Sequence, residues 1–383
     1  MPHRRNIVYF AIFTLLFWTI GPLMVYIVDP YHIFHETRWN KNLWFGSQML
    51  INLGQIEAYL KRSNDYDGIL VGTSHTMNFK GSHLAKAVGS KGVLKLCNGN
   101  QSPELGLMWL QKGLSTGKVK YCFVGMDALM YTIPKPDLVL ESNKIYTDHP
   151  WTCLINIQCL QDVLNLMFIK LGLSQEKPEL WSWKEPDCIH GWEDNIFELD
   201  HWIRPYKLKE LKRKVPVLSH YQLKSCNQHE WVRYIDEIWL KAAKENLSVK
   251  FFLILTPCAL TQSIAVLKEP NITPEEFYDG YFHFVRYLIT ACSKLQNVQV
   301  YGWYDCAFVG NCANFFDAIH YHSGISHYIT WCIEHDKHRL TKENYDAYEA
   351  RCVENLRAFK ILDSYPHRDT FDELVTAEMQ DGN

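Results

Sequence analysis

Short apolar segments, separated by stretches with helical spacing, constrain the fold of this chain more than any other feature. Each segment is rich in β-branched or aromatic residues and too short for a helix, so each predicts a strand that is buried on both faces. Strands that alternate with helices in this way predict an α/β fold, a parallel sheet sandwiched between helices. The predicted strands are residues 69–72, 93–97, 119–124, 249–255 and 298–303.

A longer apolar run opens the chain. Residues 7–28 carry no charged side chain, and a helix of about 20 such residues spans the hydrocarbon core of a bilayer. Arg4 and Arg5 precede the run and Asp29 follows it, so the positive-inside rule places the N-terminus in the cytoplasm and the remainder outside. A cleaved signal peptide would have a shorter apolar region, of about 7–15 residues, and a small-residue cleavage site. We therefore expect one retained transmembrane helix as an anchor.

The region between the third and fourth predicted strands interrupts the alternation. It is rich in tryptophan, with clustered charges and several prolines. We interpret it as an insertion, a lid or substrate platform whose tryptophans could stack on sugars, although a second small core is the favoured role for them. The predicted organisation is an anchor (1–28), a juxtamembrane segment (29–66), two halves of a sheet domain (67–134 and 246–340) around the insertion (135–245), and a polar C-terminal tail (341–383).

Charge and cysteine usage exclude several classes of function. The formal net charge is −3 at pH 7, which argues against nucleic acid as a partner bound through its phosphates. None of the twelve cysteines shows the paired C-x-x-C spacing with neighbouring histidines that marks a structural zinc site. We therefore expect no metal and no cofactor. Cys306 and Cys312 are close enough in sequence to close a small loop by a disulfide in an oxidising compartment.

Two polar motifs carry the candidate chemistry. One lies near the beginning and the other near the end of the sheet domain in the sequence. The first predicted strand stops at Gly72-Thr73-Ser74, which places a small nucleophilic side chain at the carboxyl end of a parallel strand. Asp317 and His320 lie three residues apart before the last core helix, so one turn can supply a general base and the carboxylate that orients it. Singly, Ser74 could be a turn residue, His320 a surface histidine and Asp317 a helix cap. Their joint placement favours a catalytic triad.

These motifs resemble those of the SGNH (GDSL-like) hydrolase superfamily. Gly72-Thr73-Ser74 looks like its Gly-Asp-Ser nucleophile motif, with a Thr73 hydroxyl that can still fix the turn, and Asp317-Ala318-Ile319-His320 matches its terminal D-x-x-H motif. The N-terminal span followed by Val28-Asp29-Pro30-Tyr31 is similar to the membrane-anchored bacterial envelope branch, relatives of proteins of alginate O-acetylation and teichoic acid D-alanylation. The resemblance covers most of residues 5–335 outside the insertion. It implies an SGNH/flavodoxin-like sheet, with Ser74 as nucleophile, His320 as base and Asp317 as its orienting carboxylate.

The resemblance also implies a set of oxyanion donors. The backbone N–H of Ser74 would be one, and Gly99 in the loop after the second strand another. Where the family's Gly-x-Asn-Asp motif provides an asparagine, this chain has Gly125-Met126-Asp127. A carboxylate would repel an oxyanion, so we expect Asp127 to point elsewhere or to be structural, with Asn98 as a substitute donor. His75, next to the nucleophile, is not expected to be the base, because adjacent side chains diverge.

Two functions of different class follow. The first is a membrane-anchored serine esterase or O-acyltransferase that acts on acyl esters of an envelope carbohydrate through an acyl-serine intermediate. Hydrolysis and transfer use the same residues and differ in water exclusion and acceptor binding. The second is a non-catalytic SGNH-like protein that binds polysaccharide or an integral-membrane acyltransferase partner. The resemblance implies the bacterial inner membrane, a cytoplasmic N-terminus and a periplasmic or extracellular main domain, and the Ser74, Asp317 and His320 motifs favour the enzyme.

Overall fold

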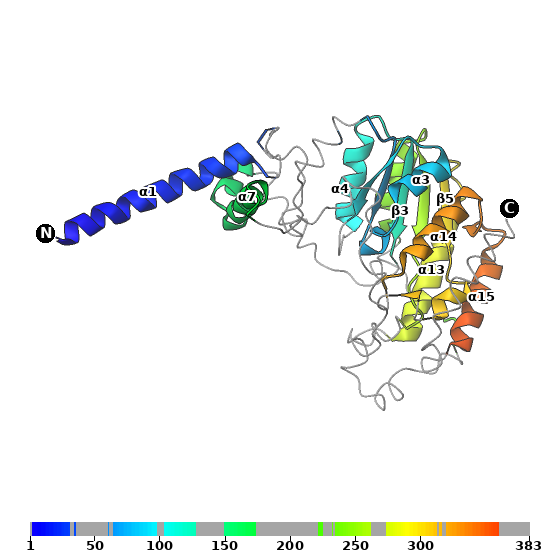
Figure 1. The fold of residues 1–383 in the computed structure, drawn as a ribbon. Helices are drawn as coiled ribbons and strands as arrows, with labels where there is room; N and C mark the ends of the chain where they lie inside the picture. Colours follow the sequence, from blue (N-terminus) through cyan, green and yellow to red (C-terminus); the bar gives the residue numbers. More distant parts are fainter. Residues whose placement is uncertain are drawn as a thin grey trace, which may run out of the picture. The chain divides into compact units, whose positions relative to one another are not determined.

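The fold is that of a computed structural model (Figure 1). The chain divides into two compact units, one of Met1–Ser63 and Asp137–Glu185, the other of Asn64–Pro136 and Pro186–Asn383. The range 135–245, predicted as one insertion, is thus shared between the two units. The structure describes residues 2–30, 34–35, 60, 64–97, 103–127, 149–173, 221–224, 232, 234–261, 273–311, 314–315 and 319–359.

The second unit is built on a six-stranded sheet with strand order β2-β1-β3-β4-β5-β6. All neighbours are parallel except β6, which pairs antiparallel with β5. The chain adds β2 on one side of β1 and β3 on the other, so the carboxyl ends of β1 and β3 flank a topological switch point, where doubly wound sheets bind their ligands. The strands are β1 (Gly68–Gly72), β2 (Val93–Cys97), β3 (Tyr121–Met126), β4 (Lys250–Leu255), β5 (Val298–Gly302) and β6 (Arg339–Leu340).

The five parallel strands are buried along almost their whole length. A sheet covered on both faces needs near-continuous apolar strands, and the runs of valine, isoleucine, leucine and phenylalanine provide them. The predicted α/β class with a mostly parallel sheet is confirmed, and the strand predicted over residues 93–97 coincides with β2. Lys95, in the middle of β2, is an exception to the apolar pattern because its side chain is fully buried.

Helices cover both faces of this sheet. Helix α3 (Gly81–Val88) leads from β1 to β2 and packs against α14 (Ser323–Glu334), and Figure 1 shows the two side by side. Helix α4 (Pro103–Leu114) leads from β2 to β3 and packs against the π-helical segment η4 (Tyr234–Leu240), which also contacts α13 (Pro274–Cys292). The two crossovers run in opposite directions along the sheet, so right-handed connections place α3 and α4 on opposite faces.

A helix lies within the range that was predicted to be a polar tail, residues 341–383. Helix α15 (Tyr345–Ala358) has one apolar stripe at helical spacing, while its other faces are polar. The stripe is too narrow to raise the average hydropathy of the range, so overall polarity does not reveal this helix. The buried residues of the stripe are Tyr345, Tyr348, Cys352 and Leu356.

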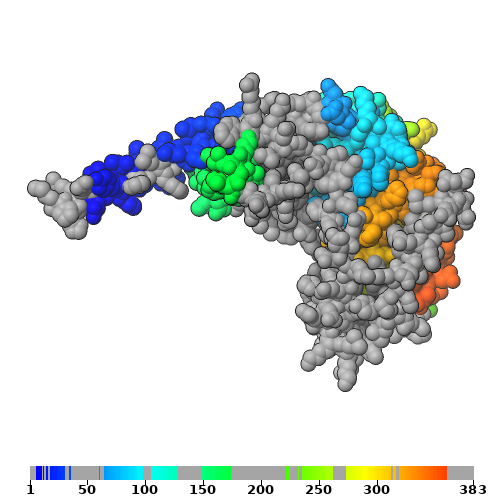
Figure 2. Space-filling model, viewed as in Figure 1, coloured from blue at the N-terminus to red at the C-terminus, as the bar shows by residue number. Residues whose placement is uncertain are grey.

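The first unit contains helix α1 (Pro2–Val28) and helix α7 (Ile157–Lys170), preceded by the 3-10 turn η2 (Pro150–Ile155). Helix α1 contacts both η2 and α7, and the space-filling view shows the green α7 lying against the blue α1 (Figure 2). These contacts enclose a small apolar core. Its buried members are Val25, Val28, Cys153, Cys159, Val163 and Leu166.

Helix α1 includes the whole of the predicted anchor, residues 7–28. Of the helices in the described part of the chain, none is sufficiently long and apolar to cross a membrane. Large apolar side chains of α1, among them Phe10, Leu15 and Trp18, are exposed. Most of the predicted juxtamembrane segment and most tryptophans of the predicted insertion lie outside the described residues.

Candidate active site

The first candidate residue, Ser74, stands in a tight turn at the carboxyl end of β1. The strand ends at Gly72, and the 3-10 turn η1 (Ser74–Thr76) follows after one residue. Thr73 caps this turn, because its Oγ1 accepts a hydrogen bond from the N–H of His75 at 3.2 Å. A hydroxyl therefore fixes the turn. Ser74 is half-buried between buried neighbours, so the turn presents the serine and hides the residues on either side.

Two glycines let this turn lie close over the edge of the sheet. A Cβ added at Gly72 would lie 2.6 Å from Thr76 Oγ1, and a Cβ added at Gly125, near the end of β3, would overlap Thr76 Cγ2. Thr76 in turn donates a hydrogen bond from Oγ1 to the carbonyl oxygen of Thr73 at 2.8 Å. Thr76 therefore occupies the space that side chains on both strand ends would fill, and it holds the serine turn at the switch point.

His320, the predicted base, is far from Ser74 in the sequence, but its side chain contacts the serine in the structure. Its Nε2 lies 2.8 Å from Ser74 Oγ. The residue is held in the loop before α14, and His322 caps that helix by accepting a hydrogen bond on Nδ1 from the N–H of Gly324 at 3.0 Å. A serine hydroxyl and an imidazole at this separation are within reach for proton transfer. The structure therefore brings together two of the three predicted triad residues.

Two buried side chains hold the chain around the serine. Asn78 donates from Nδ2 to the carbonyl oxygen of Tyr321 at 3.3 Å, which joins the segment after the turn to the histidine loop. Lys95 donates from Nζ to the carbonyl oxygens of Met77 at 2.7 Å and Phe79 at 2.8 Å, on either side of Asn78. A buried ammonium group such as that of Lys95 is tolerated when hydrogen bonds of this kind replace its contacts with water. Both residues support the geometry of the site, and neither belongs to a motif that sequence reasoning recognises.

A histidine–carboxylate pair, His75 and Asp127, lies beside the pair of Ser74 and His320. His75 is buried, with its Nε2 3.3 Å from Asp127 Oδ2 and its Nδ1 3.8 Å from Cys258 Sγ. The rings of His75 and His320 meet edge to face, with their centroids 5.5 Å apart. Asp127 therefore points at His75. The donor atoms of His75, Asp127 and Cys258 lie within 4.8 Å of one another, close enough to hold a metal ion.

Tyr321, next to His320, is a site residue that sequence reasoning missed. Its ring meets that of His75 edge to face, with 6.4 Å between centroids, and its buried hydroxyl has no hydrogen-bond partner among the described residues. Burial, together with the nearby Cys258 and Asp127, raises the pKa of Tyr321 well above its usual range. The phenol therefore stays protonated and can donate a hydrogen bond.

Three predicted site residues, Asn98, Gly99 and Asp317, lie outside the described residues. The two loop donors and the carboxylate that would orient the base therefore stay predictions. The described part of the site is the pair of Ser74 and His320, with Asp127 engaged by His75.

The described geometry defines a class of site. It places a serine hydroxyl in hydrogen-bond contact with a histidine at the switch point of a doubly wound sheet, an arrangement that can support nucleophilic catalysis. Comparison of the chain with known protein families, curated proteins and solved structures finds no match.

Proposed function

We propose that this chain is a membrane-anchored serine esterase or O-acyltransferase of the SGNH type, which acts on acyl esters of an envelope carbohydrate. The observation that carries the proposal is the 2.8 Å separation of Ser74 Oγ and His320 Nε2. The strand order supports it, because the run 2-1-3-4-5 is that of flavodoxin-like sheets, whose ligands bind between the carboxyl ends of β1 and β3. Ser74 follows β1 directly.

The proposed reaction begins with attack of Ser74 Oγ on the acyl carbonyl while His320 Nε2 takes the hydroxyl proton. The carbonyl electrons move to its oxygen, and the backbone N–H of Ser74, with Asn98 and Gly99 as further proposed donors, stabilises that oxyanion. The sugar oxygen leaves with the proton from His320, which gives the acyl-serine. Water or a second sugar hydroxyl then attacks the acyl-serine while His320 takes its proton. The bond to Ser74 Oγ breaks, and Oγ leaves with the proton from His320, which restores the serine. Asp317 is proposed to orient the imidazole.

The acyl-enzyme provides the test. The full chain is mixed with 4-nitrophenyl acetate, quenched in acid, digested and analysed by mass spectrometry. We expect release of nitrophenol with turnover and an acetyl group on the peptide that carries Ser74. Acetylation of lysines alone, or no release by folded protein, would instead favour the non-catalytic alternative, in which the domain binds polysaccharide or an integral-membrane acyltransferase.

The membrane anchor is part of the same proposal. Its support is the uncharged run of residues 7–28 on α1 and the exposure of Phe10, Leu15 and Trp18. In a bacterial host we expect the full chain to remain in the membrane fraction after an alkaline wash and to enter solution with detergent.

Substitution of the same three side chains tests the anchor. Phe10→Lys, Leu15→Lys and Trp18→Lys together are expected to move the protein into the soluble fraction, because a lysine at the bilayer centre costs about 2.5–3.5 kcal/mol on insertion scales. Leu247→Lys, at a leucine that is 71% exposed in the other unit, is the matched control and should stay with the membrane. An unsubstituted chain found in the soluble fraction would refute the anchor.

A further inference from the structure

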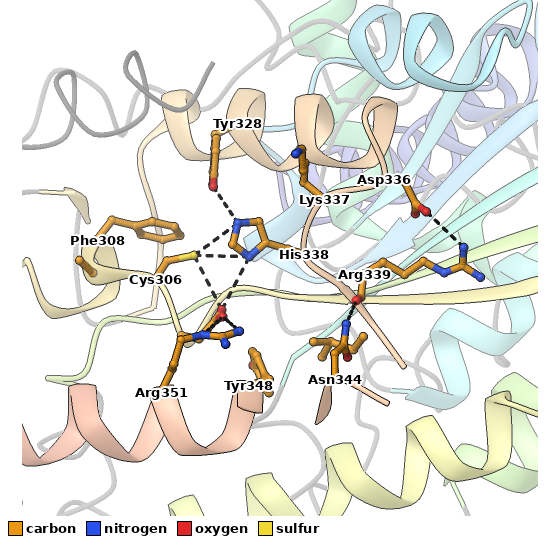
Figure 3. Close-up of a pocket in the computed structure, with 13 residues that line it drawn as sticks. Cys306, Phe308, Tyr328, Asp336, Lys337, His338, Arg339, Asn344, Tyr348 and Arg351 are labelled. Carbon is orange, nitrogen blue, oxygen red and sulfur yellow. Dashed lines mark hydrogen bonds and ion pairs between the residues drawn. The ribbon is translucent and has the colours of Figure 1, made fainter. Parts of the chain in front are cut away.

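A cavity of about 570 Å³ lies where β5 meets β6, and no residue of the serine–histidine site lines it (Figure 3). Its wall contains a group of three half-buried residues, Asp305, Cys306 and His338, whose side chains can ligate a metal. Asp305 and Cys306 follow β5, and His338 comes just before β6. The antiparallel pairing of β5 with β6 brings these distant positions together. Cys312, with which Cys306 could form a disulfide by sequence, lies outside the described residues.

The three donor atoms form a nearly equilateral triangle. Cys306 Sγ lies 3.8 Å from His338 Nδ1 and 3.9 Å from Asp305 Oδ1, and the last two atoms are 3.7 Å apart. The nitrogen–oxygen separation is too long for a hydrogen bond. Cys306 Sγ makes only long contacts, to Asp305 Oδ1 and to both ring nitrogens of His338, the second of them Nε2 at 3.9 Å. The centre of such a triangle lies about 2.2 Å from each corner, close to zinc bond lengths of about 2.3 Å to sulfur and about 2.0–2.2 Å to nitrogen and oxygen.

Two of the three side chains are also held by outer partners. Tyr328 Oη lies 2.9 Å from His338 Nε2, the ring nitrogen that a metal on Nδ1 leaves available (Figure 3). Arg351 donates from Nε and Nη2 to Asp305 Oδ2, at 3.0 and 2.7 Å, and leaves Oδ1 directed at the triangle. Metal-binding histidines and carboxylates are oriented by hydrogen bonds of this kind.

The loop before β6 has an uncommon backbone. Asp336 and His338 have φ angles of +50° and +56°, in the left-handed region that residues with a Cβ seldom adopt. Such conformations persist where the surrounding structure requires them, often at ligand sites. Here the carbonyl oxygen of His338 accepts a hydrogen bond from the N–H of Gly302 at 3.2 Å, and its ring points toward Cys306 (Figure 3).

We propose that Asp305, Cys306 and His338 bind one Zn²⁺ ion, with a fourth ligand from the cavity. Binding replaces the proton of the Cys306 thiol, which passes to solvent. The thiolate and the Asp305 carboxylate together balance the two charges of the ion. Three protein ligands and one open position are typical of zinc sites that hold water or a small ligand. Asp336, Lys337 and Arg339 also line the cavity, and Arg339 Nη1 lies 3.3 Å from Asp336 Oδ2.

This proposal departs from the expectation of no metal. That expectation rested on the lack of C-x-x-C pairs, whereas the proposed ligands come from both sides of a β5–β6 pairing and leave no local spacing to detect. The proposal does not depend on the proposed ester chemistry, because the cavity and the serine–histidine pair share no residue.

The test is a titration of the full chain, freed of metal by a chelator, with Zn²⁺ alone. We expect one ion per chain by calorimetry, a rise in the unfolding temperature because the folded state binds the ion, and a thiolate-to-cobalt charge-transfer band when Co²⁺ is used. Cys306→Ser should abolish that band and weaken zinc binding by about 100-fold or more. Tyr328→Phe, which removes only an outer partner, should weaken it by about 10-fold.

Matched controls distinguish this site from the other cluster. Cys258→Ser removes the sulfur beside His75, and Ser74→Ala removes the proposed nucleophile, and both should bind zinc as the unsubstituted chain does. If Cys306→Ser does not fold, His338→Gln and Tyr328→Phe carry the same comparison. No stoichiometric binding, equal binding by Cys306→Ser or His338→Gln, or loss of binding only in Cys258→Ser would overturn the proposal.

Discussion

Ser74→Ala and His320→Gln are each expected to lower kcat for a small acetyl ester by roughly 10⁴-fold. Alanine removes the oxygen that attacks, and glutamine cannot take its proton, so either change stops the same step. The double variant should therefore be no slower than Ser74→Ala alone, because residues that act as a unit are strongly non-additive. Steady-state release of nitrophenol from 4-nitrophenyl acetate measures all three variants.

His322→Asn is the matched control for His320→Gln. His322 lies in the same loop, two residues further on, but its Nδ1 caps α14 at Gly324. Asparagine is a good helix cap, so kcat should stay within about threefold. If His322→Asn lowers kcat as much as His320→Gln does, the loss comes from disruption of the loop. The 2.8 Å contact between His320 and Ser74 would then no longer support a role for His320 as the base.

The serine turn shows what could be predicted from sequence. A strand that is buried on both faces needs an unbroken apolar run, so its end is visible where Gly72-Thr73-Ser74 interrupts the run. In parallel sheets the carboxyl ends share one edge, which is why Ser74 and Asp127 could be expected near each other. The partner of Asp127 could not be read in this way, because His75 was discounted as a neighbour of the nucleophile.

The residues that hold the site together escaped prediction for a different reason. In the sequence, Lys95 only interrupts the apolar pattern of its strand. Its role depends on the two carbonyl oxygens to which it donates, and the sequence does not reveal these. Asn78 acts on Tyr321, 243 positions away along the chain. Such roles depend on which loops meet in space. The apolar stripe of α15 is visible only from its helical spacing, because the overall polarity of that range hides it.

Gly125→Ala is expected to lower the free energy of unfolding by about 2–3 kcal/mol, the upper part of the range for overpacking a core. The added methyl would overlap Thr76 Cγ2, and Thr76 has little room to move away because it already lies close against Gly72 on the neighbouring strand. Esterase activity should fall in parallel, since η1 carries Ser74. Urea unfolding of the full chain, followed by circular dichroism, measures the change. Gly310→Ala is the control, because its Cβ would meet its neighbours at 3.9 Å, and stability should change by less than about 0.5 kcal/mol.

Thr76→Ser supplies the rescue that makes this prediction specific. Serine lacks Cγ2 but keeps the hydroxyl that bonds Thr73, so alone it should cost about 1 kcal/mol for the lost methyl. Combined with Gly125→Ala, it should restore most of the stability, and the two changes should couple by about 1–2 kcal/mol in a double-mutant cycle. If the two changes lower the free energy of unfolding additively, the methyl added at residue 125 does not clash with Thr76. Coupling that restores both stability and ester hydrolysis would show that the glycine at the end of β3 is required to leave room for the nucleophile turn of β1.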